Sequence, residues 1–296
     1  IALPGVKGRF DHMALDGRGR FWLTALGNNS VEVLNLDGGE RIESIKGPKE
    51  PQGVAFIPDL DRIVVASGED GIVRYLDESL KVVGSVEGLE DADNVRYDAR
   101  EKRIYVGYGK GALAVLDAER MSKLSEIPLD GHPESLQLEQ RGARIFVNVP
   151  DAKHVAVVDR EKGKVAAKWP IKEARGNYPM ALDEGHGRLF VVCRKPAKLL
   201  VLETESGKVL TSVECTGDAD DVFYDAARGR IYISGGEGYI SIIDQIDADH
   251  YRPVAKLPTA SGARTSLLSP DGTRLYLAVP HALGREAEVR VYRTAP

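Results

Sequence analysis

One short pattern recurs seven times along this chain of 296 residues: an arginine opens an apolar run that is rich in β-branched and aromatic residues. The seven runs are Arg20–Leu23, Arg62–Val65, Arg103–Val106, Arg144–Val147, Arg188–Val191, Arg230–Ile233 and Arg274–Leu277. Successive arginines lie 41 to 44 residues apart. A near-constant period of this length indicates a repeat architecture, in which each repeat forms one structural unit.

Each repeat contains further short apolar runs, separated by turns that hold glycine or aspartate. One run precedes the arginine, as in Val95–Asp98, and two follow it, as in Ala112–Asp117 and Lys81–Val86. Four short strands per repeat at this period are typical of a propeller blade. The sequence therefore predicts an all-β fold: a seven-bladed β-propeller with four antiparallel strands in each blade.

The last repeat stops just after its third strand, Val289–Tyr292, so its blade needs an outer strand from elsewhere. Ile1–Gly5 resembles Ile127–Leu129, which closes the fourth strand of repeat three. We therefore expect residues 1–6 to complete the seventh blade and to cover an exposed sheet edge. One domain of residues 1–296 is predicted. Its blades are residues 8–47, 48–88, 89–131, 132–173, 174–217, 218–260, and 261–296 together with 1–6.

The segments Arg103–Asp117 and Arg188–Lys208 resemble the repeat of the YncE-like, or YVTN-repeat, family of bacterial β-propellers. The resemblance extends over the whole chain and implies the propeller fold. It also implies export to the periplasm or out of the cell, because such propellers are commonly exported. It implies no particular activity, since most members of the family lack a known one.

Composition and charge exclude several classes of protein. Lys and Arg number 40 against 45 Asp and Glu, a net charge of -5, so nucleic acid is not an expected partner. Every apolar run is shorter than the roughly 18 residues that cross a bilayer, so no membrane span is expected. The two cysteines form no Cys-x-x-Cys motif, which argues against structural zinc. We expect a monomer from which a signal peptide was removed, or which never had one.

An acid precedes most of the repeated arginines by four or five residues. These acids are Asp16, Asp98, Glu139, Asp183 and Asp225. Such spacing predicts a tight hairpin in which acid and arginine face each other and form a cross-strand ion pair worth a few tenths of a kcal/mol. The arginines are therefore interpreted as scaffold and not as an anion-binding ring.

In a propeller, the segments that lead into the first strands and the loops between second and third strands open on one face, here called the top. We expect the leading positions to surround the mouth of the central channel. They are Asp11, Gln52, Asp93, Glu134, Tyr178, Asp220 and Arg264, followed directly by His12, Gly53, Asn94, Ser135, Pro179, Asp221 and Thr265. The residue type at these positions differs from blade to blade, although the repeat itself is regular. These positions are therefore the expected site of binding specificity.

The rim is predicted to bind a small polar ligand, a metal ion or a partner protein. The expected ligand-binding residues are Asp11, His12, Gln52, Asn94, Glu134, Tyr178, Arg264 and His281. Clustered carboxylates and an amide oxygen suit Ca²⁺ or Mg²⁺. The predicted metal ligands are Asp93, Asn94, Glu134, Asp220 and Asp221. The alternative is that the acids accept hydrogen bonds from turn amides.

The histidines divide between the two faces of the predicted propeller. His12, His132, His154 and His281 are expected at the top. His186 and His250 fall in turns of the opposite face and are expected on the surface.

Catalytic residues are not identifiable, and whether the protein is an enzyme stays open. The chain has no Gly-x-Ser-x-Gly motif, and the glycine-rich Gly235–Gly238 falls in a hairpin turn and opens no helix. The alternative function is a metal-dependent hydrolase or lactonase. Propellers of the gluconolactonase type hold one divalent cation on Glu, Asn and Asp side chains. The resemblance implies that Glu134, Asn94 and Asp220 or Asp221 would be the corresponding ligands here. Those enzymes have six blades, whereas this chain has seven repeats.

Cys193 and Cys215 end the second and fourth strands of the fifth repeat, so both thiols should reach the same end of the blade. Strands two apart are separated by about 9.6 Å, which a disulfide spans only if the loop after Val213 folds back. A disulfide and two buried, unreactive thiols both remain open.

Overall fold

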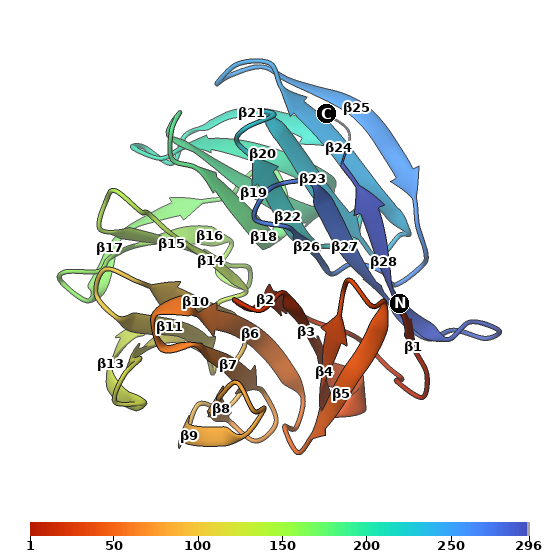
Figure 1. Ribbon diagram of the computed structural model, residues 1–296. Coiled ribbons are helices and arrows are strands. Elements are labelled where there is room, and N and C mark those ends of the chain that lie inside the picture. Colours follow the sequence, from red (N-terminus) through yellow and green to blue (C-terminus); the bar gives the residue numbers. More distant parts are fainter. Residues whose placement is uncertain (295–296) are drawn as a thin grey trace. The chain divides into compact units, whose positions relative to one another are not determined.

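The computed structural model describes residues 1–294 (Figure 1). Apart from two short 3-10 turns, η1 (Leu26–Asn28) and η2 (Pro58–Leu60), the secondary structure of these residues is entirely strand. The strands form seven four-stranded antiparallel sheets, which are the blades of a β-propeller. The predicted fold class is confirmed.

The chain consists of two compact units. Unit 1 contains Ile1–Pro133 and Ala278–Arg290, and unit 2 contains Glu134–Leu277 and the C-terminal residues from Val291. That all seven blades form a single domain stays a prediction.

Blades one to three lie in unit 1, and each is a hairpin meander of consecutive strands. Blade one consists of β2 (Met13–Leu15), β3 (Arg20–Ala25), β4 (Ser30–Asn35) and β5 (Glu40–Lys46). Blade two consists of β6 (Pro51–Ile57), β7 (Arg62–Ser67), β8 (Ile72–Leu76) and β9 (Val82–Val86). Blade three consists of β10 (Val95–Asp98), β11 (Arg103–Tyr108), β12 (Ala112–Asp117) and β13 (Ser122–Pro128).

Blades four to six lie in unit 2 and repeat the same meander. Blade four consists of β14 (Ser135–Leu138), β15 (Arg144–Val149), β16 (His154–Asp159) and β17 (Lys164–Pro170). Blade five consists of β18 (Arg175–Asp183), β19 (Arg188–Lys195), β20 (Ala197–Glu203) and β21 (Val209–Glu214). Blade six consists of β22 (Ala219–Asp225), β23 (Arg230–Gly235), β24 (Tyr239–Gln245) and β25 (Tyr251–Pro258).

The seventh sheet joins the two ends of the chain, in the order β1 (Ala2–Leu3), β28 (Ala287–Arg293), β27 (Arg274–Val279) and β26 (Ser266–Leu268). In β1, Leu3 lies opposite Ala287 of β28. The amino group of Ile1 donates to the carbonyl oxygen of Val289 at 2.8 Å, and the amide of Val289 donates back at 2.8 Å. The N-terminal strand therefore closes the last blade, as predicted.

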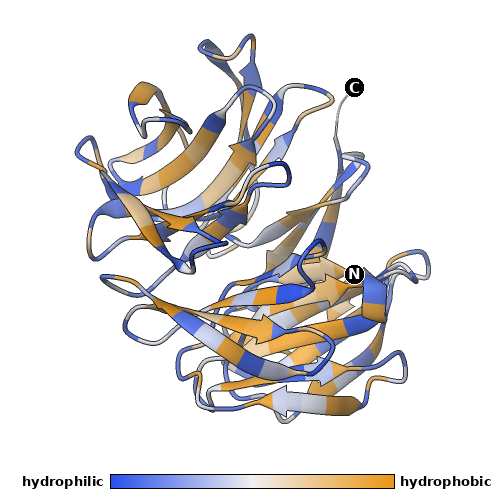
Figure 2. Ribbon diagram, turned by 90° about the vertical axis from the view of Figure 1, so that its left-hand side faces the viewer, coloured by the Kyte–Doolittle hydropathy of each residue, from blue (hydrophilic) through white to orange (hydrophobic). Residues whose placement is uncertain are grey.

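The core lies between the faces of neighbouring blades. In unit 1, Trp22 and Val33 of blade one pack with Val65 of blade two in one cluster of buried residues. In unit 2, Phe146 of blade four packs with Leu200 of blade five in another. Because both faces of a blade are covered, the second strands are buried along nearly their whole length, which explains their unbroken apolar runs (Figure 2).

The hairpin that joins the first and second strands has the predicted register. Asp98 lies directly opposite Arg103 in blade three. The predicted ion pair forms in blades one and four, where Arg20 contacts Asp16 at 2.6 Å and Arg144 contacts Glu139 at 2.6 Å. The repeated arginines thus have the expected structural role in these blades.

In blades five and six, however, the predicted pairing with the arginine is wrong. Asp183 instead binds the imidazole of His186 at 2.7 Å, and Asp225 binds the guanidinium of Arg228 at 2.7 Å. Both partners lie three residues after the acid, inside the turn. The arginines across these hairpins have other partners, because Arg188 contacts Asp249 at 2.8 Å and Arg230 contacts Asp244 at 2.8 Å.

Of the two alternatives for Cys193 and Cys215, the disulfide is not formed, and both cysteines are free. Cys193 and Glu214 both align with Lys198, so Cys215 is offset from Cys193 by one residue. Side chains alternate between the faces of a sheet, and the two thiols accordingly pack in different interblade clusters. Burial raises the pKa of each thiol to about 12.

Candidate functional site

The segments that lead into the first strands share a backbone feature. In five blades, the residue two positions before the predicted rim residue has a positive φ. These residues are Glu50 (49°), Asp91 (56°), Gly176 (67°), Asp218 (53°) and Gly262 (81°). Aspartate tolerates this conformation better than most residues. The positive φ therefore accounts for the aspartates at positions 91 and 218.

Three side chains of unit 1 converge at the leading segments of blades one and three. Nε2 of His12 lies 3.8 Å from Oδ1 of Asp11 and 3.4 Å from Oδ1 of Asp93. Within the described part of the chain, they form the one group of at least three acidic, histidine or cysteine side chains whose potential ligand atoms lie within 4.8 Å of one another. We call it the Asp–His–Asp cluster.

Backbone hydrogen bonds fix all three residues of the cluster. The amide of Asp11 donates to the carbonyl oxygen of Thr24 at 2.9 Å, and the amide of Thr24 donates to the carbonyl oxygen of His12 at 3.1 Å. These two bonds extend the β2–β3 ladder. The amide of His12 donates across to Gln52 of blade two at 3.3 Å. The amide of Asp93 donates to Gly107 of blade three at 2.9 Å. The side chains therefore project from ordered positions.

Gly53 allows the neighbouring blades to approach each other beside the cluster. A Cβ atom at this position would collide with the carbonyl oxygen of Asp93 and would lie 2.8 Å from Cγ2 of Val95. Only glycine fits this spacing without a shift of the backbone. The leading segment of blade two can thus lie between His12 and Asp93 without separating them.

Asp93 is the least accessible member of the cluster, with 9% of its side chain exposed, against 18% for His12. Its Oδ1 atom is buried and accepts no hydrogen bond from the described residues. The described residues also place no lysine or arginine within ion-pair distance of it, and His12 is its nearest basic group. A buried carboxylate oxygen without a donor is costly, and a bound cation would remove that cost.

The acid-rich segment of unit 2 is neutralised by arginines. Arg194 forms ion pairs with Asp220 and, at 3.7 Å, with Asp218. Arg264 contacts Asp218 at 3.0 Å and Asp220 at 3.9 Å. The guanidinium of Arg194 also stacks on the ring of Tyr178, 3.6 Å from its centroid. Two acids of this segment, Asp218 and Asp220, are therefore already paired with arginines of the protein itself.

Asp221 and Glu134 have different surroundings in unit 2. A carboxylate oxygen of Asp221 accepts the backbone amide of Ser266 at 2.7 Å and so ties blade six to blade seven. Burial and the nearby charge of Glu134 raise the pKa of the Tyr178 hydroxyl. The structure thus brings Tyr178, Asp220 and Arg264 together around Arg194.

The predicted site residues belong to both units. Asp11, His12, Gln52, Asp93, Asn94 and His281 lie in unit 1, and Glu134, Tyr178, Asp220, Asp221 and Arg264 lie in unit 2. A metal site that combines Asp93 and Asn94 with Glu134, Asp220 and Asp221 stays a prediction. Asp93 instead lies beside Asp11 and His12, which were predicted as ligand-binding residues.

The remaining predicted residues differ in accessibility. Asn94 is almost completely buried, and the Gln52 amide lies against Gly68 of its own blade. His281 is exposed in the loop between β27 and β28. His154 is buried, whereas Nδ1 of His132 lies 2.7 Å from a backbone carbonyl oxygen.

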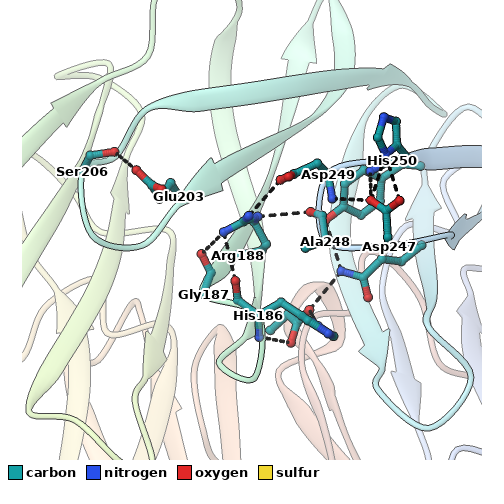
Figure 3. Close-up of polar contacts among 12 residues, drawn as sticks. His186, Gly187, Arg188, Glu203, Ser206, Asp247, Ala248, Asp249 and His250 are labelled. Carbon is teal, nitrogen blue, oxygen red and sulfur yellow. Dashed lines mark hydrogen bonds and ion pairs between the residues drawn. The ribbon is translucent and has the colours of Figure 1, made fainter.

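His186 and His250 lie on the surface of unit 2, as predicted, with 56% and 77% of their side chains exposed. Figure 3 shows the polar contacts of these turns, in which Arg188 binds Asp249 and the carbonyl oxygen of Ala248. These contacts join the turns of blades five and six.

Arg194, which contacts the acid-rich segment of unit 2, was not predicted from the sequence. It lies near the end of β19, directly after Cys193, in the loop region that the propeller topology assigns to the same face as the leading segments. A basic residue at the end of a second strand, beside a blade whose leading segment holds three acids, is the signal that would have indicated it.

Fold and site together define a seven-bladed β-propeller with a polar cluster at its leading segments. No family model matches the chain. The chain is similar to the uncharacterized protein YncE of Salmonella typhi, with 25% identity over 197 residues, or 64% of this chain and 55% of that protein. YncE of Escherichia coli O157:H7 is 24% identical over 219 residues, or 73% of this chain and 61% of that protein. The chain is thus a seven-bladed β-propeller that is similar to YncE proteins, and the matches span 55% and 61% of the length of these relatives.

Solved structures support the fold over the whole chain. A chain of Kuenenia stuttgartiensis hydrazine synthase superposes with a TM-score of 0.84 at 18% identity and covers 99% of both chains. A chain of a mitotic checkpoint complex gives a TM-score of 0.84 at 15% identity and covers 100% of this chain and 91% of its own. At these identities the likeness concerns the fold alone. Among the described residues, no helix is long and apolar enough to span a membrane.

Proposed function

We propose that the protein is a binding module whose Asp–His–Asp cluster captures a divalent metal ion. The observation that carries this proposal is the buried Oδ1 atom of Asp93, which accepts no hydrogen bond and lies 3.4 Å from Nε2 of His12. Two carboxylates and one imidazole at this spacing are a suitable ligand set for one cation. In unit 2, Asp218 and Asp220 already form ion pairs with Arg194 and Arg264, which favours the cluster in unit 1 as the cation site.

Cation binding should stabilise the folded protein, because the three ligand atoms converge only in the folded chain. At a free cation concentration of 100 times Kd, the gain is about 2.7 kcal/mol. An unfolding entropy of about 2.1 cal/mol/K per residue then gives an increase in Tm of about 4 °C for a chain of 296 residues.

The test is a thermal-shift measurement of the chelator-treated protein with a panel of divalent cations, repeated with Asp93→Asn. Wild type should gain stability with at least one cation, and the variant should not. If the cluster binds no cation, Asp93→Asn should raise Tm slightly, because it removes a buried carboxylate next to Asp11. That increase, with no cation effect in wild type, would contradict the proposal.

We further propose that the protein acts in the periplasm or outside the cell, since YncE-like propellers are commonly exported. Fractionation of the native host, followed by detection of the protein with an antibody, tests this placement. Recovery in the cytosolic fraction alone would contradict it.

A further inference from the structure

We propose that the metal is a zinc-like divalent transition metal, held by Asp11, His12 and Asp93 with one coordination position left open. The proposal rests on the proposed function of the cluster and adds the class of metal. It also differs from the Ca²⁺ or Mg²⁺ expected from the sequence, because the ligand set that the structure assembles contains a nitrogen.

The spacing of the ligand atoms fits a small coordination sphere. Zinc binds histidine nitrogen and carboxylate oxygen at about 2.0–2.2 Å, and tetrahedral geometry then places neighbouring ligands about 3.3–3.6 Å apart. Nε2 of His12 lies 3.4 Å from Asp93 and 3.8 Å from Asp11. All three potential ligand atoms lie within 4.8 Å of one another, so side-chain movements of about 1 Å or less would complete this geometry.

The kinds of ligand atom select among metals. Ca²⁺ requires six to eight oxygen ligands, and Mg²⁺ prefers an octahedron of oxygens. The cluster offers two carboxylates and one imidazole, and imidazole nitrogen favours zinc, nickel, cobalt and copper. Two carboxylates also neutralise the charge of a divalent ion at a site where only 9–18% of each side chain is exposed.

The cluster is built before any metal binds. Its residues are held by backbone hydrogen bonds to blades one, two and three, and Gly53 provides the space that lets His12 and Asp93 meet. The Oδ1 atom of Asp93 is buried among these elements, faces the imidazole and accepts no hydrogen bond. This oxygen is an independent indication of a ligand, separate from the clustering of acids.

Three protein ligands leave a fourth position for water or a ligand from solution, which is the arrangement of exchangeable zinc sites. The cysteines do not supply it, because both lie in unit 2 and burial raises the pKa of each thiol to about 12. The fourth ligand is therefore expected to be an oxygen or nitrogen from solution.

The test uses the full chain after chelator treatment and titrates ZnCl₂ and CaCl₂ separately by calorimetry. Wild type should bind one zinc ion, with an affinity at least 100-fold higher than for calcium. His12→Gln should weaken zinc binding at least 100-fold, and Asp93→Asn should abolish it. The matched control is His250→Gln. His250 is an exposed histidine that also contacts an aspartate, Asp247, but it belongs to no group of three potential ligands among the described residues. This variant should bind zinc as wild type does.

Cobalt provides a measurement on wild type that needs no variant to fold. A four-coordinate Co²⁺ site with nitrogen and oxygen ligands should give strong visible absorption and no thiolate charge-transfer band. Near-UV circular dichroism of the metal-free variants checks their folding.

The outcomes separate the two proposals. Calcium or magnesium binding as tight as zinc binding, or zinc binding unchanged in His12→Gln, would overturn the zinc-class assignment and leave cation binding intact. A cobalt spectrum with thiolate bands, or loss of zinc in His250→Gln, would also overturn it. No binding of any cation to wild type would overturn the proposed function itself.

Discussion

Replacement of Leu3 by alanine tests whether the N-terminal strand holds the seventh blade closed. Leu3 is fully buried and lies opposite Ala287 in the β1–β28 pair. Truncation of a buried leucine costs about 2–5 kcal/mol, through lost burial and the cavity that remains. An unfolding entropy of about 0.6 kcal/mol/K for 296 residues converts this loss into a decrease in Tm of about 3–8 °C, if the chain unfolds cooperatively.

The matched control is Leu283→Ala, which makes the same chemical change in the same unit. Leu283 is completely exposed in the loop before β28, so its truncation should change stability by less than about 0.5 kcal/mol. Differential scanning calorimetry of both variants provides the comparison. Equal Tm values for the two variants would refute the closing role of β1. Deletion of residues 1–6 should lower Tm in the same direction as Leu3→Ala.

Three further changes test the account elsewhere in the chain. Gly53→Ala should cost about 1–3 kcal/mol by overpacking and should weaken zinc binding, and an unchanged Tm would contradict the close approach of blades two and three. Thiol titration at pH 8 should find Cys193 and Cys215 unreactive in the native protein, because burial raises the pKa of each thiol to about 12. After unfolding without a reductant, the same titration should find two thiols. Fewer than two would indicate a disulfide. Burial raises the pKa of Asp16, but hydrogen bonds from the Trp22 indole, the Arg20 guanidinium and turn amides hold this pKa below the ordinary value of an aspartate. The stabilisation is therefore present above that ordinary value and lost as pH falls through the lower folded value. Asp16→Asn should therefore flatten the acid limb of a stability-against-pH curve, and an identical limb would contradict this role.

The fold was predictable because it depends on local pattern and period. The arginine-led runs are buried between blades, so their spacing directly reports one blade per repeat. The similarity of Ile1–Gly5 to a fourth strand was enough to predict the pairing with β28, which confirms that an incomplete last repeat carries information about the first residues. Period and strand count do not depend on the details of side-chain packing.

Side-chain partners were less predictable because small local geometry decides them. A one-residue offset in register placed Cys193 and Cys215 on opposite faces of blade five. Asp183 binds His186 within its own turn, while the arginine across the hairpin, Arg188, binds Asp249 of the next blade. In each case the spacing was read correctly, and the direction of the side chain followed from contacts that spacing does not contain.

The sequence indicated the segments in which the candidate site lies, but not which side chains contact one another there. Charged side chains gather at the leading segments, and His12 and Asp93 were both named among the expected site residues, but the site itself stays a prediction. Their contact required the missing side chain of Gly53 between two blades, which no repeat pattern reveals. The neutralisation of Asp220 required Arg194 from the neighbouring blade, a long-range contact of the same kind.

The central claim is that Asp11, His12 and Asp93 hold one metal ion. Crystals of the full chain soaked in ZnCl₂ and measured on both sides of the zinc absorption edge test it most directly. The account predicts one strong anomalous peak about 2.0–2.2 Å from Nε2 of His12 and from a carboxylate oxygen of each aspartate, and its loss in Asp93→Asn crystals. A strongest peak elsewhere on the protein, with this cluster empty, would contradict it.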